Sequence, residues 1–466
     1  MPYKPQSEPG KTDYQPDVQI TTLGEKIGDP AAPADFPKHI LRFRNDRWDQ
    51  SVGLDELSEE QWLNHFGKFE PLADNLDPPL ALRYHGHQFR TYNPEIGDGR
   101  GFLFAQLRDH EQRLMDLGTK GSGTTRWSRT GDGRLTLKGA VREILATEML
   151  EALGVNSSKT FSVVETGEQS MRGDEPSPTR SAAMTRLSHG HIRIGTFQRI
   201  AYEKNEKLMH QLVAYCLDHY YGGAQSGDPA AELFAHATRE VAKLAGAYMT
   251  AGFVHGVLNT DNINITGESF DYGPWRFTPY WEPAFTAAYF DHEGLYCFAR
   301  QPEALHWNLA QLASALRLIA DSDPLVETLE TFPKAYGTAF TEHFCWRLGV
   351  VSEGFEKDRD LVVAAEKGLA AKTTHIDRFF HDWCKMDDLA KPDELDPEFA
   401  DFGSLIAERG RSRKPNSRYW QQPEPCSMHI DEVESIWNAI ADKDDWSPLS
   451  KKIENIRNMG QALRNG

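Results

Sequence analysis

The chain has 466 residues, of which 39% are hydrophobic and 11% aromatic, a composition that predicts two or three folded lobes or one large α+β unit. Lys and Arg number 51 against 69 Asp and Glu, and the formal charge of -18 argues against non-specific binding to nucleic acid or to an anionic membrane. No segment approaches the roughly 20 apolar residues that cross a bilayer, and no signal-peptide core stands at the start, so we expect a cytoplasmic protein.

The composition and the spacing of apolar residues change near residue 96. Residues 1–35 are rich in Pro, Gly and acidic side chains and predict an extended arm or a poorly ordered tail. From Ile96 onward, short apolar runs are broken by glycines in GDGRGFLFAQL and MDLGTKGSGTTRWSRTGDGRLTL. This pattern is typical of strands joined by glycine-rich turns.

A helix and two further strands follow. Val141, Ile144, Leu145 and Met149 recur at helical spacing within residues 138–153, and Gly154 stands where a helix commonly ends. The segments FSVVETGE and SAAMTRLS then read as two strands around a polar turn that contains Pro, Gly and Ser. The order is therefore strand, strand, helix, strand, strand.

Beyond Asn205 the pattern is mainly helical. Helices are predicted at EKLMHQLVAYCLDHYY, at PAAELFAHATREVAKLAGAYMTAG and, after an interruption, at WNLAQLASALRLIA. The interruption, FVHGVLNTDNINITGESFDYGPW, predicts a small hairpin that carries a loop. A β-rich half thus precedes an α-rich half.

This order of elements is the one by which kinase-like folds handle ATP. Gly97, Asp98, Gly99 and Arg100 would form a tight turn whose backbone N–H groups can approach phosphate. Taken alone, the tetrapeptide is more often an ordinary hairpin turn. The turn gains meaning only from the residues that follow it.

Four charged side chains extend the comparison. Lys120, in DLGTKGSG, and Glu143, near the start of the predicted helix, could pair and aim the ammonium group at a phosphate. Taken singly, they would be a surface lysine and a glutamate favoured by the helix dipole. Arg186 and Arg193 suit bidentate phosphate contacts, although each alone is more often a solvated surface residue.

The sharpest local signal lies in HGVLNTDNINITGESFDYG. Asp261 and Asn262 stand side by side, and Asp271 follows in a DYG that resembles the DFG at which kinases hold magnesium. A carboxylate and an amide oxygen suit a hard divalent cation and leave room for phosphate oxygens and waters. The alternative, an Asn/Asp-rich turn, explains less well why the acidic residues recur behind His255.

Histidines and cysteines predict no transition-metal or disulfide site. His85 with His87 and His189 with His191 form two H-x-H pairs, which we interpret as turn or capping residues because no Cys or carboxylate stands at ligand spacing. The five cysteines are widely spaced and include no C-x-x-C pair, which indicates free thiols in a reducing compartment.

Several long motifs, in one order along the chain, resemble the selenoprotein O (SelO) family. They are HGHQFRTYNPEIGDGRG, KGSGTTRWSRTGDGR, REILATEMLEALGV, TRLSHGHIRIGTF, HGVLNTDNINI and DYGPW, and they cover roughly residues 80–320. The resemblance implies a protein-kinase-like bilobal fold with a β-rich N-lobe, a helical C-lobe and additional C-terminal helices. It also implies that ATP binds in a flipped orientation and that AMP passes to Ser, Thr or Tyr hydroxyls of protein substrates.

The matching positions imply roles for twelve residues. The nucleotide would be held by Gly97, Gly99, Arg100, Lys120, Asp132, Gly133, Arg186, Arg193 and Asp271. Glu143 would steady Lys120, and Asp261 would accept the proton of the incoming hydroxyl. Asn262 and Asp271 would bind Mg²⁺ or Mn²⁺.

The resemblance also implies a division of the chain. Residues 1–80 would form an extension that packs on or around the lobes, 81–204 the N-lobe, and 205–466 the C-lobe, with the catalytic and metal loop at 255–273. The tail from about residue 414 matches the family poorly. It has no cysteine near its end, where some members carry a redox-active cysteine or selenocysteine, so we expect no redox control of that kind.

Two other functions stay open on the residues alone. One is a kinase that transfers the γ-phosphate to a small molecule or protein, and the other is a pseudokinase that binds ATP without catalysis. The expected partners are ATP and protein substrates, with no nucleic acid and no membrane. The net negative charge further predicts protein partners with basic patches.

Overall fold

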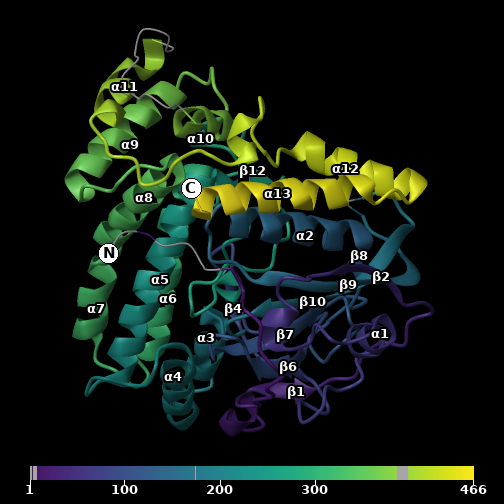
Figure 1. The fold of residues 1–466 in the computed structure, drawn as a ribbon. Coiled ribbons are helices and arrows are strands. Elements are labelled where there is room, and N and C mark those ends of the chain that lie inside the picture. Colours follow the sequence, from purple (N-terminus) through teal and green to yellow (C-terminus); the bar gives the residue numbers. More distant parts are fainter. Residues whose placement is uncertain (1–2, 4–7, 174, 386–396, 466) are drawn as a thin grey trace.

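An antiparallel sheet forms the first part of the fold in the computed structural model, which describes residues 3, 8–173, 175–385 and 397–465. Its strand order is β1-β3-β6-β7-β10-β9-β2, with β8 paired to β10 (Figure 1). The strands are β1 (Gly28–Pro30), β2 (Ile40–Arg44), β3 (Leu80–Leu82), β6 (Leu103–Arg108), β7 (Leu114–Lys120), β8 (Leu135–Thr136), β9 (Lys159–Ser170) and β10 (Thr179–Ser188). Register shifts between paired strands interrupt the ladders and help the sheet to curl.

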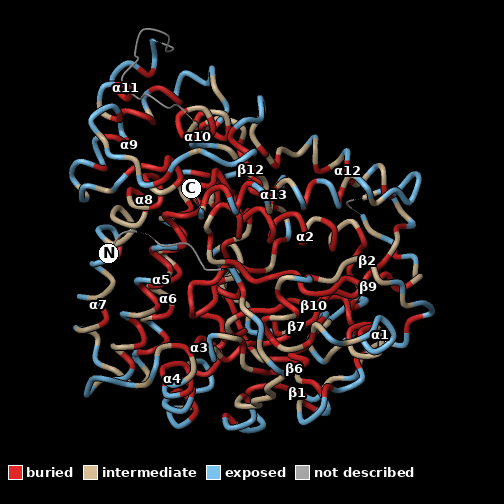
Figure 2. The backbone as a smooth tube through the Cα atoms, in the orientation of Figure 1, coloured by how far each residue is buried: buried red, intermediate tan, exposed pale blue. Residues whose placement is uncertain are grey.

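The elements predicted for residues 96–188 are confirmed. The two glycine-broken runs contain β6 and β7, and FSVVETGE and SAAMTRLS lie in the antiparallel pair β9 and β10. Helix α2 (Leu137–Ala152) begins after Thr136, whose hydroxyl accepts a hydrogen bond from Gly139 N at 3.1 Å. The chain leaves the helix through Gly154, with φ of 80°. Helix α2 is almost entirely buried between the sheet and the C-terminal helices (Figure 2).

Both edges of the sheet come from the first 45 residues, which the sequence pattern did not predict. Strands β1 and β2 stand at the two ends of the strand order. Residues 8–35, expected to be an extended arm or poorly ordered, are extended over much of their length and fixed to the sheet. The Gln106 side chain accepts hydrogen bonds from Gln19 N and Ile20 N, at 2.9 and 2.7 Å, and Ile20 is buried. Apolar residues so widely spaced give no periodic signal.

Helices make up most of the second part. They are α3 (Ile194–Tyr202), α4 (Glu206–Tyr220), α5 (Pro229–Ala251), α6 (Gln301–Leu316), α7 (Ser322–Glu330), α8 (Phe332–Leu348), α9 (Phe355–Leu369), α10 (Ile376–Lys385), α11 (Ala400–Ala407), α12 (Ile430–Lys443) and α13 (Ser447–Asn465), while α1 (Glu59–Phe66) lies beside the sheet. The three predicted helices after residue 205 are confirmed as α4, α5 and α6, and α5 packs against α6, α7 and α8. Within the described ranges, no helix is both long and apolar enough to cross a membrane.

The last two helices return to the N-terminal part. Helix α13 lies along α2 (Figure 1), and a Cβ added to Gly460 would come within 3.1 Å of Ala152. Arg457 of α13 pairs with Glu148 of α2 at 2.8 Å, and Glu434 of α12 pairs with Lys138 at 2.7 Å. The C-terminal helices therefore hold the helix that carries Glu143.

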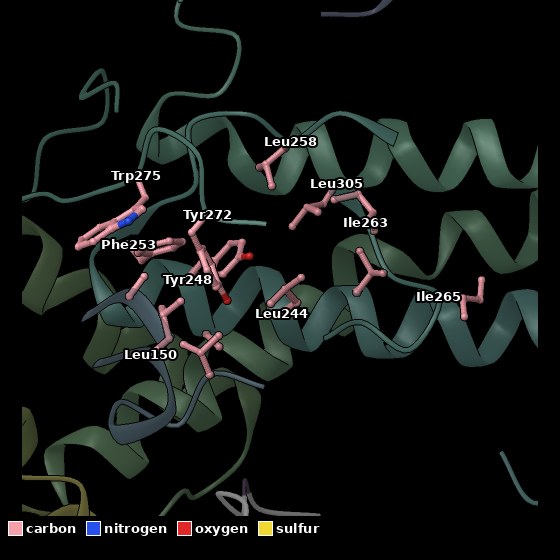
Figure 3. Packing of buried hydrophobic residues seen from close by; sticks show 14 of the residues in the cluster. Leu150, Leu244, Tyr248, Phe253, Leu258, Ile263, Ile265, Tyr272, Trp275 and Leu305 are labelled. Carbon is pink, nitrogen blue, oxygen red and sulfur yellow. The ribbon is translucent and has the colours of Figure 1, made fainter. Parts of the chain in front are cut away.

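A continuous apolar core supports the segment between α5 and α6. Figure 3 shows Leu258, Ile263 and Tyr272 of this segment packed with Leu244 and Tyr248 of α5, and all five side chains are buried. Burying a large apolar side chain contributes about 1.5–3 kcal/mol. These anchors fix the backbone on both sides of the polar residues that lie between them in the sequence.

A buried carboxyl group links the same segment to the end of β10. Glu268 accepts a hydrogen bond from His189 N at 2.9 Å, and burial raises the pKa of Glu268 to about 7. The folded protein therefore binds more protons than the unfolded chain between about pH 4.5 and 7, and stability falls as the pH rises through that window.

The variant Glu268→Gln cannot ionise but can still accept the hydrogen bond. We expect its free energy of unfolding, relative to the natural protein, to increase by on the order of 2 kcal/mol between pH 5 and pH 8. Urea denaturation of both proteins at the two pH values measures this difference. A difference that does not change with pH would contradict the assignment.

Candidate active site

A short hairpin carries the Asp/Asn loop, as predicted. Strand β11 (Phe253–Val254) pairs with β12 (Arg276–Phe277), and the loop between them contains a 3-10 turn over Thr260–Asn262. His255 is buried, with its Nε2 at 3.0 Å from the Phe270 carbonyl oxygen, so it ties the two ends of the loop together.

A second hairpin holds this loop from the side of the sheet. Strands β4 (Gly86–Gln88) and β5 (Thr91–Asn93) pair, and His87 N donates to Thr260 Oγ1 at 2.6 Å. Phe89 N donates to Asn259 Oδ1 at 3.0 Å. Thr260 Oγ1 also donates to Gln198 Oε1 of α3 at 2.7 Å. The turn before Asp261 is therefore bound to two other elements.

Ten of the twelve predicted site residues line one cavity of about 690 Å³, which we call the central cavity. They are Gly97, Gly99, Arg100, Lys120, Asp132, Gly133, Arg186, Arg193, Asp261 and Asp271. Glu143 pairs with Lys120 behind the wall of the cavity. In the described part of the chain, Asn262 is not among the lining residues, and its Nδ2 donates to the Val257 carbonyl oxygen at 3.0 Å.

Lys120 is the centre of the charged groups in the cavity. Its Nζ lies 2.5 Å from Glu143 Oε1 and 2.6 Å from Asp271 Oδ1, and only 4% of its side chain is exposed. Burial alone would raise the pKa of Asp271, but Lys120, Arg186 and Arg100 hold it well below its usual range. Asp271 also has φ of 63°, an unfavourable region for a residue other than glycine, which the surrounding contacts maintain.

The two predicted arginines are buried rather than solvated. Arg193 donates from Nη1 to the Asp261 carbonyl oxygen at 3.1 Å, and its Nη2 lies 3.4 Å from Asp98 Oδ1. Arg186 Nη1 lies 3.8 Å from Asp271 Oδ1. Within the described residues, Arg186 Nε and Nη1 and Arg193 Nε have no hydrogen-bond acceptor. Buried guanidinium groups with free N–H donors beside a cavity are suited to an anion.

Asp261 differs from Asp271 in its electrostatic surroundings. Burial raises the pKa of Asp261 to about 6, although Arg193 opposes this effect. Its Oδ1 is buried and has no hydrogen-bond partner within the described residues. Gly86 packs against it so closely that an added Cβ would lie 2.7 Å from that oxygen. The carboxylate is thus confined and has one unused acceptor, as a proton acceptor requires.

The glycine turn is shaped by a residue that the sequence did not single out. A Cβ at Gly97 would lie 2.6 Å from the Trp127 ring, and Trp127 Nε1 donates to Asp29 Oδ2 at 2.9 Å. Ser128 Oγ donates to the Gly99 carbonyl oxygen at 2.5 Å. The loop after β7 therefore fixes the turn, and a tryptophan within a glycine-rich segment was the available signal.

Two other lining residues come from the turn between β9 and β10. Met171 and Arg172 border the central cavity, and Arg172 Nη1 lies 2.7 Å from Asp132 Oδ2. Asp132 therefore has an ion-pair partner already. No motif marks Met171 or Arg172, because turn residues between long strands show no periodicity.

The histidine pairs lie among these supports. His87 Nδ1 is 2.7 Å from Gln198 Nε2, and His85 Nδ1 is 2.8 Å from the Tyr92 hydroxyl. His191 N donates to Asp116 Oδ2 at 2.8 Å. Among the residues that the structure describes, no group of three or more His, Cys, Asp or Glu side chains is arranged to hold a metal ion.

Comparison with known proteins identifies the family. The profile described as "Protein adenylyltransferase SelO" matches residues 10–457, well beyond the 80–320 span of the motifs. "Protein nucleotidyltransferase YdiU" of Synechococcus elongatus is 40% identical over 97% of this chain and 96% of its own length. The proteins of the same name from Synechocystis sp. and Gloeobacter violaceus are each 40% identical, over 95% and 96% of this chain and 98% and 95% of theirs. The chain therefore belongs to the SelO family and is a protein nucleotidyltransferase.

Proposed function

We propose that the chain transfers AMP from ATP to Ser, Thr or Tyr hydroxyls of other proteins, on a protein-kinase-like bilobal fold. The observation that carries this proposal is the buried Lys120 between Glu143 and Asp271, at the wall of a cavity that Arg186 and Arg193 also line. Catalysis of phosphoryl and nucleotidyl transfer depends mostly on positioning and on neutralising charge, which these residues supply.

The triphosphate is held by the cationic side of the central cavity. Lys120, Arg186 and Arg193 contact its phosphate oxygens, and Arg100 adds a further positive charge. Gly97 and Gly99 bring the backbone close to the nucleotide, and Asp132 and Gly133 line the same cavity. The free N–H groups of Arg186 and Arg193 support this arrangement. ATP bound in the flipped orientation presents its α-phosphate to the acceptor.

A divalent cation fits the two oxygen donors of the loop. Asn262 donates its amide hydrogen to Val257 O, which leaves the amide oxygen available, and Asp271 supplies a carboxylate. Mg²⁺ is commonly bound by one or two protein oxygens together with substrate phosphates, and Mn²⁺ also accepts such ligands. We propose that Asn262 and Asp271 hold Mg²⁺ or Mn²⁺, which neutralises phosphate charge when bound.

Asp261 receives the proton of the attacking hydroxyl. The acceptor oxygen forms a bond to the α-phosphorus, the bond from that phosphorus to the bridging oxygen breaks, and pyrophosphate leaves. The buried carboxylate is positioned by Arg193 through its backbone carbonyl and by Gly86 through close packing. An aspartate base suits a hydroxyl nucleophile whose proton it can reach.

The same proposal includes the division of the chain and its location. The N-lobe corresponds to residues 81–204 and the C-lobe to 205–466, with residues 1–80 as an extension. The tail from about residue 414, expected to match the family poorly, is matched by the family profile as far as residue 457. The five cysteines are free and buried, which supports a reducing cytoplasm.

Labelled ATP tests the function directly. We expect protein acceptors incubated with the enzyme and Mg²⁺ or Mn²⁺ to acquire label from [α-³²P]ATP and not from [γ-³²P]ATP. Intact-mass measurement should show the addition of AMP. Transfer of γ-label would establish a kinase instead, and bound ATP without transfer of either label would establish a pseudokinase.

A further inference from the structure

A second cavity of about 460 Å³ adjoins the central cavity and is called the side cavity here. Arg100, Lys120, Arg134 and Arg172 line both cavities, so the two are contiguous. The side cavity extends from this shared wall past the start of α2 to the segment after Asp271. The roles proposed above account for the central cavity and leave this one without an occupant.

The lining of the side cavity is basic, whereas the chain as a whole is acidic. Seven basic and three acidic residues line it, although the whole chain carries a formal charge of -18. Several of these cations already have partners, such as Lys138 with Glu434 and Lys120 with Glu143. Within the described residues, Arg100 and Arg276 have no ion pair and Arg142 has only a distant one. Arg100 also lines the central cavity, so Arg142 of α2 and Arg276 of β12 are the weakly paired cations that belong to the side cavity alone.

Arg142 and Arg276 are poorly neutralised by the protein itself. Arg142 Nη2 donates to the Trp275 carbonyl oxygen at 2.9 Å, but its Nη1 is 3.8 Å from Glu434, the only carboxylate paired with it among the residues that the structure describes. Within the described ranges, Arg276 has no ion-pair partner. Burial and, next, the charge of Arg276 lower the pKa of Arg142 to about 10. An anion between the two guanidinium groups would relieve this repulsion.

Exposed aromatic side chains form the rim of the side cavity. Tyr289 and Phe290 line it and are 78% and 41% exposed. Together with Met171 at the central cavity, they are three of the eight large hydrophobic residues that are exposed in the described chain. Aromatic residues beside arginines are enriched in the energetic centres of protein interfaces.

The rim leads to the proposed base. The Phe290 ring lies 5.7 Å from Phe89, which in turn lies 5.0 Å from Tyr296. Phe89 N and the Tyr296 hydroxyl both bind Asn259 Oδ1, at 3.0 and 2.8 Å, two residues before Asp261. Tyr296 and Asn259 are buried, so this chain of contacts links the rim through the interior of the protein to the turn that carries the carboxylate receiving the hydroxyl proton.

We propose that the side cavity binds an acidic segment of the protein substrate, near the hydroxyl that receives AMP. Glutamate or aspartate side chains of that segment pair with Arg142 and Arg276, and apolar side chains contact Tyr289 and Phe290. This inference rests on the proposed transfer of AMP to protein hydroxyls. The net negative charge of the chain led to the expectation of partners with basic patches. The side cavity instead favours an acidic substrate segment, because the charge around a site governs what binds there.

Two synthetic peptides test the proposal. They have equal length, a single central serine and leucines at the same positions, and the flanking residues are Glu in one and Lys in the other. With [α-³²P]ATP we expect the natural enzyme to use the Glu peptide with a kcat/KM at least about tenfold higher. Equal use, or preference for the Lys peptide, would overturn the proposal.

Variants separate substrate docking from nucleotide binding. Arg276→Glu should raise the KM for the Glu peptide by about tenfold or more and improve use of the Lys peptide, with the KM for ATP within about twofold. Tyr289→Ala should raise the KM for both peptides, because both carry leucine. Arg317→Glu changes an exposed arginine after α6 and is the matched control. It should leave the KM for both peptides and for ATP unchanged.

The outcomes also distinguish this inference from the function on which it rests. A rise in the KM for ATP in Arg276→Glu, with unchanged peptide preference, would assign the side cavity to the nucleotide and overturn the docking proposal alone. Failure of the natural enzyme to label either peptide or any protein in an extract, while ATP still binds, would overturn the proposed function together with it.

Discussion

Replacing Asp271 with asparagine is expected to lower the kcat for AMP transfer by about 1000-fold or more. Asparagine keeps the shape of the side chain but removes the negative charge that lies 2.6 Å from Lys120 Nζ. Lys120 and Arg186 would then face the cavity without their shared carboxylate, and the proposed cation would lose its charged protein ligand. Both the position of the triphosphate and the neutralisation of its charge depend on this residue.

Transfer from [α-³²P]ATP to a protein acceptor measures the effect, and binding of Mn²⁺ followed by electron paramagnetic resonance reports the cation separately. Asp360→Asn, an exposed carboxylate of α9, is the control for loss of one charge and should retain full activity. If Asp271→Asn kept more than about a tenth of the natural kcat while folded, Asp271 would not be a ligand of the reacting complex.

Adding one methyl group at Gly86 is expected to lower kcat by about 100-fold while changing the KM for ATP little. In Gly86→Ala the new Cβ would lie 2.7 Å from Asp261 Oδ1 and 3.1 Å from Asp261 Cβ. The Asp261 side chain would have to move, because the backbone of its turn is held by His87 N through Thr260 Oγ1. A displaced base misaligns the hydroxyl but leaves the cationic groups around the triphosphate in place.

Steady-state kinetics with varied ATP and varied acceptor check this result. Gly227→Ala is the matched control, since a Cβ there meets no atom within 4 Å. Thermal melting of both variants separates a local displacement from loss of the fold. Full kcat in a folded Gly86→Ala protein would show that Asp261 tolerates displacement, which is incompatible with its role as the base.

The Lys120 and Glu143 pair shows how much of the site local sequence patterns can predict. The glycine-rich strand and the helix with apolar residues at helical spacing were predictable, and so was the placement of the lysine in one and of the glutamate in the other; in the structure Glu143 lies toward the middle of α2. The structure brings these two side chains to 2.5 Å. That Asp271, 151 residues from Lys120, completes the group follows only from the way in which the C-terminal half packs against the sheet.

Other parts of the site had no sequence signal strong enough to find them. The β4–β5 hairpin consists of two short strands, and its contacts to Thr260 and Asn259 join residues that are 173 and 170 positions apart in the chain. Trp127 is part of the motif KGSGTTRWSRTGDGR, but its position on Gly97 is fixed by a hydrogen bond to Asp29 of β1, an edge strand that has no periodic pattern. Short elements with long-range partners leave little periodicity to read.

The sequence by itself determined the β-rich then helical order, the residue types that carry the chemistry, and the family, because strand and helix periods and long motifs are local properties. Only the tertiary structure decided which charges meet. It buried Arg186 and Arg193 with free N–H groups, raised the pKa of Asp261 to about 6, and gathered positive charge in the side cavity of an acidic protein. Burial and charge contacts arise between residues that are far apart in the chain, so composition and local spacing do not predict them.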